Sequence, residues 1–306
     1  MAKKTSIGGQ ALIEGIMMRG PKVSAMAVRD PQGNIVLEKW DNEPADKKTT
    51  FIDKLKKVPV VRGVFNFASA MISGYKALMK SAEISGLEEE DKKDSKGVMV
   101  IVGVLSAVLS VVLSVGLFIF LPTFIYDLLS KVIPALVGNR VLKSVFEGVL
   151  KILILVGYMS AVSLMKDIRR TFQYHGAEHK TIFCYEAGLE LTVENVRGQG
   201  RFHPRCGTSF LIVMLLVSIF IGMIIPPELP PVIRTLIKIV LLPLTMGLGY
   251  EFIKFAGKHD NIVTKILSAP GLWMQRITVL EPTDEMIECA IAAVNEVIPD
   301  DGSDLI

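Results

Sequence analysis

Residues Val98–Ile125 read VMVIVGVLSAVLSVVLSVGLFIFLPTFI, a run of 28 positions without one charged side chain. At a rise of ~1.5 Å per residue, a helix of this length is ample to cross a bilayer. Hydrophobic residues make up 50% of the chain, and they fall in long uncharged blocks of this kind. The composition therefore predicts a multi-pass α-helical membrane protein.

Three further segments are predicted to cross the membrane, although two of them contain charged residues. The second span carries Glu147 and Lys151, and the fourth carries Arg234 and Lys238. Arg234 and Lys238 can pair with Glu147 or extend toward the membrane surface, and such anchoring is favoured over a pore or substrate path. The predicted spans after the first are 144–165, 208–225 and 232–253.

The distribution of basic residues predicts how these spans are oriented. The 97 residues before the first span hold 17 Lys and Arg, the loop 166–207 holds seven and the tail from residue 254 holds four. The connection 126–144 holds three, and 226–231 holds none. The positive-inside rule then places both termini and loop 166–207 in the cytoplasm.

The part of the chain before the first span divides into two predicted units. Residues 1–57 are expected to form a small β-rich cytosolic unit, because apolar segments flank the turn Asp30-Pro31-Gln32-Gly33-Asn34 in a hairpin pattern. Residues 58–97 combine a moderately apolar segment with a charged linker. That segment suits an interfacial helix, a re-entrant segment or a packed cytosolic helix.

The transmembrane domain is predicted over residues 98–253 and includes the cytosolic loop 166–207. The tail 254–306 follows it, with an apolar strand-like piece that ends at Leu280. A helix is predicted over 282–297, and its apolar stripe needs a partner in the cytosol.

The residues that can carry chemistry gather in loop 166–207. The chain has only four histidines and three cysteines, and most of them lie between residues 175 and 206. His175 and His179 lie one turn apart on a helix that is predicted to continue the second span past Lys166. Two imidazoles so placed can bind one metal ion and leave Glu178 to act on a water molecule, as in the His-x-x-Glu-His motif of inverted zincins.

A third protein ligand must come from elsewhere, and the candidates are Glu186, Glu190, Glu194, His203 and Cys206. Of these, His203 and Cys206 can supply two further ligands to a divalent metal ion, for which zinc is the expected identity. Three protein ligands with an open position describe a catalytic site. Glu178 favours catalysis, because a spare carboxylate beside a structural metal has no task, although it can also orient a ligand. A closed, structural site would use all four protein ligands: His175, His179, His203 and Cys206.

Charge and cysteine content argue against other classes of protein. The net charge of +3 is too small to predict a nucleic-acid partner, and no basic cluster is interleaved with aromatic residues. Three cysteines do not make a disulfide framework, so reduced thiols in a cytosolic environment are expected. Arg201 and Arg205 are candidate substrate-binding residues for an anionic group or a lipid phosphate, although they are equally typical of topology signals.

Five motifs resemble the YqhQ-like family and together extend over nearly the whole chain. Its members are bacterial membrane proteins usually described as predicted metal-dependent enzymes, so the resemblance implies a metal ion and a bacterial plasma membrane. It also singles out Glu14 and Arg19, which can complete a catalytic site with the histidines or form an internal ion pair. His259, on the same cytosolic side, joins the candidate substrate-binding residues. The motifs are Gly8–Pro21, Tyr174–Lys180, Arg201–Phe210, Gly257–Asn261 and Ala269–Arg276.

The combined prediction is a mainly α, four-helix polytopic membrane protein with a small β-rich N-terminal cytosolic unit and a cytosolic C-terminal helix. Its leading function is metal-dependent hydrolysis at the cytosolic membrane surface, on an amide, a peptide or a lipid-linked ester. The lipid bilayer is its expected partner. Two alternatives stay open: a membrane scaffold or assembly factor with a structural zinc site, and a transporter that relies on Glu147, Arg234 and Lys238.

Overall fold

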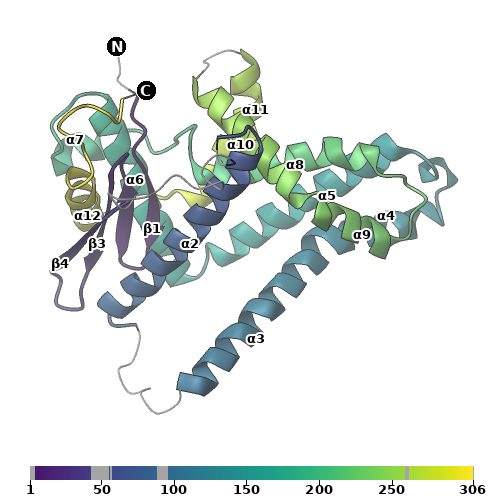
Figure 1. Cartoon of the computed structure of the whole chain (residues 1–306), viewed down its shortest axis with the longest axis horizontal. Helices are drawn as coiled ribbons and strands as arrows, with labels where there is room; N and C mark the ends of the chain where they lie inside the picture. The colour runs from purple at the N-terminus through teal and green to yellow at the C-terminus, as the bar shows by residue number, and fades with distance from the viewer. Residues whose placement is uncertain (1–3, 43–54, 56, 88–95, 259–261, 306) are drawn as a thin grey trace.

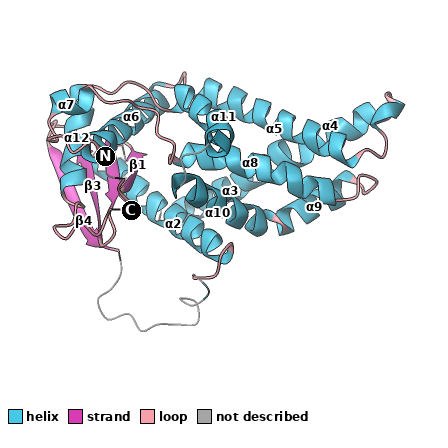
Figure 2. Cartoon of the chain, turned by 90° about the horizontal axis from the view of Figure 1, so that it is seen from above, coloured by secondary structure: helices cyan, strands magenta, loops and turns pink. Residues whose placement is uncertain are grey.

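The computed structural model describes residues 4–42, 55, 57–87, 96–258 and 262–305. A small sheet with its covering helices occupies one end of the molecule, and long apolar helices extend toward the other end (Figure 1). The first and last described residues meet beside the sheet, where Thr5 pairs with Leu305 (Figure 2). The polar segment 43–54, the charged tract 88–95 and His259 lie outside the described residues.

The predicted β-rich unit is confirmed as an antiparallel sheet of four strands in the order β1-β2-β3-β4. The predicted hairpin joins β3 to β4, and Gly33 takes the left-handed conformation that its turn needs, with φ +90°. Successive side chains of each strand point to opposite faces of the sheet. The strands are β1 (Gly8–Leu12), β2 (Gly15–Arg19), β3 (Val23–Arg29) and β4 (Ile35–Asp41).

Two helices cover one face of the sheet and a third covers the other. Ile16, Met18 and Ala27 face α6 (Lys166–Glu186) and α12 (Asp284–Asn295) in one apolar core. Leu12, Met17 and Met26 face Ala77 of α2 (Val61–Ile84) in a second core. The helix predicted over 282–297 is therefore confirmed as α12, and its apolar stripe docks on the sheet and on α6. The short helix α7 (Val193–Arg197) also packs against α12.

The segment for which the sequence left three possibilities is the long helix α2. It packs on the sheet and on α10 (Leu242–Lys258), where Gly63 meets Tyr250 and Arg62 pairs with Glu251. Its other face is apolar and exposed to the surroundings. The exposed side chains on that face are Met71, Ile72, Tyr75 and Met79.

Within the described part of the chain, three helices are long and apolar enough to cross a membrane, and a bent pair would make a fourth. The first extends from Gly103 to Ser130, five residues beyond the predicted end at Ile125, because α3 (Lys96–Val115) continues through a π-helical turn, η2 (Gly116–Phe120), into α4 (Leu121–Ser130). The short 3-10 helix η3 (Pro134–Leu136) follows it. The other two are α5 (Arg140–Val162) and α8 (Gly207–Ile224).

The fourth predicted span, 232–253, is two helices rather than one. It consists of α9 (Pro231–Val240) and α10, and the two axes differ by 50° at the break around Leu241. The structure is thus mainly helical with apolar helices that could span a membrane, and the four-span topology stays a prediction. Part of α3 stands apart from the other helices, and its side chains from Gly103 onward are not buried by the protein (Figure 1).

Two sequence predictions about helix boundaries are wrong. The second span does not continue as one helix past Lys166: α5 ends at Val162, and Met165 is extended, with ψ 132°, before α6 begins. The reason is tertiary, since α6 turns away to pack on β1 and α12. The strand-like piece before Leu280 is instead the end of α11 (Ile262–Thr278), which contains Pro270 and packs tightly on α8.

Three charged residues of the apolar helices, Glu147, Arg234 and Lys238, lie together as ion pairs. Lys238 Nζ lies 2.6 Å from Glu147 Oε2 and 2.7 Å from Thr123 Oγ1. Arg234 lies 3.7 Å from Glu147 Oε1 and donates to the carbonyl of Ile225 at 3.0 Å. Glu147 and Arg234 are fully buried, so pairing prevails over the extension to the surface that the sequence favoured.

Candidate functional site

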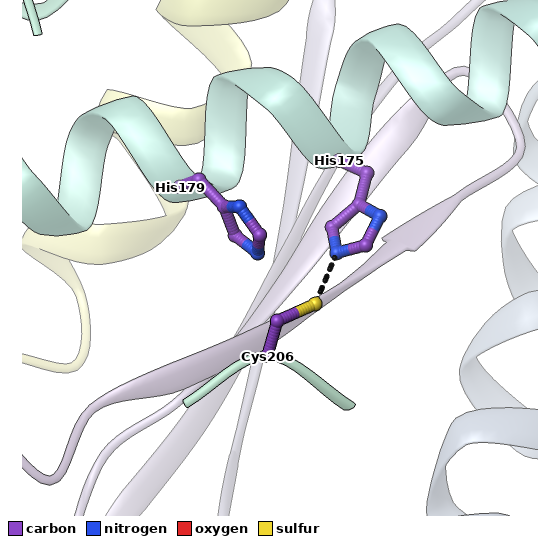
Figure 3. A group of neighbouring side chains, drawn as sticks. All are labelled: His175, His179 and Cys206. Atoms are coloured by element: carbon purple, nitrogen blue, oxygen red, sulfur yellow. Dashed lines mark hydrogen bonds between the residues drawn. The ribbon is translucent and has the colours of Figure 1, made fainter. Parts of the chain in front are cut away.

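Helix α6 and the residue that precedes α8 bring three potential metal ligands together. His175 and His179 project from one face of α6, and Cys206 reaches them from the start of α8 (Figure 3). His175 Nε2 lies 3.2 Å from Cys206 Sγ. One ligand atom from each of the three residues falls within 4.8 Å of the others.

Backbone carbonyls orient both imidazole rings. His175 Nδ1 lies 3.0 Å from the carbonyl oxygen of Thr278, and His179 Nδ1 lies 2.5 Å from that of Arg201. A ring that donates its Nδ1–H to a carbonyl keeps Nε2 as a lone-pair donor. The two Nε2 atoms and the Cys206 sulfur are then the atoms that remain for an ion. Zinc takes nitrogen and sulfur ligands at ~2.0–2.3 Å in tetrahedral geometry, which fits this donor set.

Gly176 allows the carbonyl of Thr278 to approach His175. A Cβ atom at position 176 would lie 1.9 Å from the carbonyl oxygen of Leu280, so any side chain there would displace the backbone at Leu280, two residues after Thr278. The same contact is secured by a hydrogen bond of 2.9 Å from Leu280 N to Phe172 O. The glycine inside the His-x-x-Glu-His motif is therefore required by packing.

We expect Gly176→Ala to lower the free energy of unfolding by about 1–3 kcal/mol through overpacking. If the shift of Leu280 carries Thr278 with it, the zinc binding expected at this site should also weaken about 10- to 100-fold, because His175 loses the group that orients it. Thermal unfolding in detergent and chelator competition measure the two effects. Gly200→Ala is the matched control, since a Cβ at position 200 meets nothing within 4 Å. Wild-type stability in Gly176→Ala would contradict this packing.

Glu178 lies beside the two histidines and lines the same cavity. Its side chain is buried, and its Oε1 accepts a hydrogen bond of 3.0 Å from the backbone N–H of Gly9 in β1. Burial raises the pKa of Glu178, and the neighbouring His175 and the Gly9 hydrogen bond oppose that shift. A Cβ atom at Gly9 would lie 2.9 Å from the Glu178 carboxyl carbon, so the strand approaches the carboxylate closely only because residue 9 is glycine.

His175, His179 and Cys206 form the ligand group, and the structure does not bring His203 into it. Its Nδ1 accepts a hydrogen bond of 3.2 Å from Arg205 N, and its Nε2 lies 3.7 Å from Glu186 Oε2. Burial, reinforced by the charges of Arg205 and His179, lowers the pKa of His203. Among the described residues the ligand group therefore has three members, and His203 lines the cavity beside it.

The two candidate substrate-binding arginines make internal contacts. Arg205 donates to Thr5 O at 2.5 Å and pairs with Glu186, while it also lines the cavity. Arg201 pairs with Glu281 at 3.0 Å, and its carbonyl orients His179. Both side chains thus hold the loop in place, and only Arg205 reaches the cavity.

Glu14 and Arg19, the two residues that the family resemblance singled out, lie away from the ligand group. Glu14, in the turn between β1 and β2, forms an ion pair with Arg170, with 2.5 Å between Oε1 and Nε, and it has a positive φ of 49°. Arg19 is exposed at the end of β2, opposite Gly8. Neither Glu14 nor Arg19 lines the cavity that holds the histidines, and they do not pair with each other in the described contacts.

The three ligand residues open into a cavity of about 520 Å³ between the sheet and the apolar helices. The N-terminal segment Thr5–Gly9 lines it, and so do Tyr250, Ile253 and Lys254 of α10. Sequence reasoning missed these walls, because neither segment contains a metal-ligand pattern. The carbonyls of Arg201 and Thr278, which orient the imidazoles, were also missed. Every residue has a backbone carbonyl, so a sequence does not indicate which of them accept such a hydrogen bond.

Comparison with known proteins shows to which family the chain belongs. The model of the family described as protein of unknown function (DUF1385) matches residues 58–300. The uncharacterized protein YqhQ of Bacillus subtilis (strain 168) is 35% identical in a match of 304 residues, and the match covers 95% of this chain and 92% of that protein. No solved structure matches the chain. The motifs of the N-terminal strands and of loop 166–207 thus lie within a match of nearly full length, and the chain belongs to the YqhQ-like family of DUF1385 proteins.

Proposed function

We propose that this protein is a zinc-dependent hydrolase that acts at the cytosolic surface of the bacterial plasma membrane. The observation that carries the proposal is the convergence of two imidazoles and one thiol on a cavity that a buried carboxylate also lines. Three protein ligands leave one coordination position open, which is typical of catalytic rather than structural zinc sites. A bound zinc ion would polarise a substrate carbonyl and lower the pKa of a water molecule.

The protein's own residues then have distinct roles. His175, His179 and Cys206 hold the ion, and the carbonyls of Thr278 and Arg201 keep the two imidazoles in the required tautomer. Glu178 accepts a proton from the attacking water and returns it to the leaving nitrogen or oxygen. The bond between the carbonyl carbon and that atom breaks, which yields a carboxylic acid and an amine or alcohol.

The position of the cavity supports a substrate near the membrane. Gly207, the first residue of α8, and Tyr250, Ile253 and Lys254, near the end of α10, all line it. Both helices are apolar, and α8 is one of those able to cross a bilayer. A peptide, an amide or a lipid-linked ester at the cytosolic surface can reach such a site without leaving the membrane.

The metal content of the purified protein tests the proposal directly. Wild type is expected to carry stoichiometric zinc after dialysis, and Cys206→Ser is expected to lose it, because the thiolate is one of only three protein ligands. Cys184→Ser is the matched control, since Cys184 is equally buried and its thiol contacts the carbonyl of Glu190 at 3.5 Å. Wild type without zinc, or Cys206→Ser with a full complement, would refute the proposed centre.

His203→Asn separates the catalytic site from the closed structural site of a scaffold. We expect this variant to keep its zinc, because the His203 nitrogens face Arg205 and Glu186. In cobalt-substituted wild type, added acetohydroxamate should change the visible absorption spectrum by entering the open position. Loss of metal from His203→Asn together with a spectrum that does not respond would favour the scaffold.

A further inference from the structure

A second cavity, of about 350 Å³, lies between the sheet and α2, and Arg19 lines it. Gly8 and Gln10 of β1 pair with Arg19 and Met17 of β2, respectively, and alternate residues of a strand point to the same face of a sheet. All four residues line the cavity, on the face of the sheet that α2 covers. The residue opposite Arg19 is a glycine, and a Cβ atom at Gly8 would meet nothing within 4 Å, so the space beside Arg19 is open.

Arg19 is the only charged residue among the described residues that line this second cavity. It is exposed, so a ligand can reach it, and its guanidinium forms no hydrogen bond or ion pair within the described part of the chain. Arg205, in the cavity of the ligand group, is in contrast paired with Glu186. Three uncharged polar side chains also line the second cavity, and none of them forms a side-chain hydrogen bond among the described residues: Ser6, Gln10 and Ser73. The second cavity therefore offers an unpaired positive charge.

The second cavity adjoins the cavity of the ligand group, because Ser6, Gly8 and Gly9 line both. The N–H of Gly9 bonds Glu178 on one side of β1, whereas Gly8 shares the other face of the sheet with Arg19. Neither glycine places a side chain between the two cavities. A ligand that extends past this strip of backbone can therefore contact the ligand group and Arg19 at the same time.

We propose that Arg19 binds a carboxylate of the substrate while the peptide bond to be cleaved lies at His175, His179 and Cys206. This inference rests on the proposed hydrolase function and names its substrate as a peptide with a free carboxylate. The planar guanidinium of arginine matches the two oxygens of a carboxylate. Its charge of +1 is balanced by one carboxylate, whereas a phosphate group carries about −1.5 to −2 at pH 7 and the described lining holds no second cation. Peptides have carboxylates at their C-termini and acidic side chains, and a neutral lipid-linked ester has none.

Peptides that carry a hydroxamate at the amino end test this role on the full-length, zinc-loaded protein in detergent. Alanine peptides of increasing length are prepared with a free terminal carboxylate, with a terminal carboxamide, and with an aspartate before the carboxamide. At the best length, a carboxylate should bind about 10- to 150-fold more tightly than the carboxamide, the value of a hydrogen bond between charged groups. Acetohydroxamate, which is too short to reach Arg19, reports the metal centre alone.

Two arginine variants assign the preference to its residue. Arg19→Gln should bind carboxylate and carboxamide peptides equally, with an unchanged zinc content and an unchanged affinity for acetohydroxamate. Arg169→Gln is the matched control and should keep the full preference. Arg169 is exposed on α6, has no partner among the described residues and lines neither cavity.

The outcomes distinguish the two proposals. If acetohydroxamate binds but carboxylate and carboxamide peptides bind equally at every length, the role of Arg19 is overturned and the hydrolase proposal is not. A preference that survives in Arg19→Gln overturns that role as well. If acetohydroxamate itself fails to bind, both proposals are overturned. Inorganic phosphate that displaces the carboxylate peptide more strongly than acetate does, and only when Arg19 is present, would assign the second cavity to phosphate and overturn the peptide carboxylate.

Discussion

Glu178→Gln is expected to slow hydrolysis by about 10²- to 10⁴-fold while the protein keeps its fold and its zinc, because the amide cannot accept the proton of the attacking water. Glutamine preserves the shape of the side chain and the acceptor for the N–H of Gly9, so the cavity wall should not move. The proposed zinc ligands are three other residues, and the contacts of the two histidines to Thr278 and Arg201 do not involve Glu178. The expected signature is thus a loss of rate without a loss of metal.

The measurement is the rate at which new amino termini appear in bacterial membranes incubated with the purified protein, quantified by isotope labelling and mass spectrometry. Glu190→Gln is the matched control, because Glu190 lies in the same loop and is exposed. Equal rates for wild type and Glu178→Gln at equal zinc content would rule out a role for Glu178 as general base. A rate lost together with the zinc would instead assign Glu178 to holding the site.

Glu147→Leu is expected to lower the free energy of unfolding by about 3–5 kcal/mol, the typical loss when one partner of a buried ion pair is removed. The carboxylate is the anionic partner of Lys238 and Arg234 among the apolar helices, and all three side chains are largely buried. Without it, two cations remain in a medium that solvates charge poorly. Unfolding in a denaturing detergent, followed by tryptophan fluorescence, measures the change.

Two further variants separate the effect of the buried charge from the loss of an ordinary ion pair. Glu296→Gln removes a partner from the exposed pair with Lys39, and its effect should stay below about 1 kcal/mol. The double variant Glu147→Leu/Lys238→Leu should recover part of the loss, because Arg234 keeps its bond to the carbonyl of Ile225. A double variant no more stable than Glu147→Leu would contradict the pairing.

The same double variant bears on the transporter alternative. If Glu147 and Lys238 only stabilise the helices, the recovered protein should hydrolyse membrane substrates at the wild-type rate. If it is stable and retains zinc but no longer supports function in the cell, a path through these charges would gain support. The sequence favoured surface anchoring for Arg234 and Lys238, whereas the structure places both against Glu147.

Features set by local periodicity were predictable from the sequence. The uncharged run that ends at Ile125 predicts a long apolar helix, and the turn at Asp30–Asn34 predicts a hairpin. Both structures depend on residues that are neighbours in the chain. The four-residue spacing of His175 and His179 also places them on one face of any helix. The break at Ser163–Met165 was not predictable, since no proline or glycine marks it.

The composition of the candidate site needed the tertiary structure. His203 and Cys206 are equally plausible ligands in the sequence, and only two residues separate them. In the structure, however, Cys206 lies beside His175, whereas His203 faces Glu186. That choice depends on how the chain enters α8 after packing against α11, where the side chain of Gln275 bonds both the N–H and the carbonyl of His203 at 2.8 Å. Glu14 likewise pairs with Arg170, a residue 156 positions away.

By itself, the sequence determined the apolar helices, the hairpin, the motif on α6 and, through its long motifs, the family. These follow from spacing and composition, which act between residues close in the chain. Only the tertiary structure decided which three side chains share one point and which carbonyls orient them. Those features join residues as distant as Gly9 and Glu178, and a contact between such residues is chosen by packing of the whole fold rather than by any local pattern.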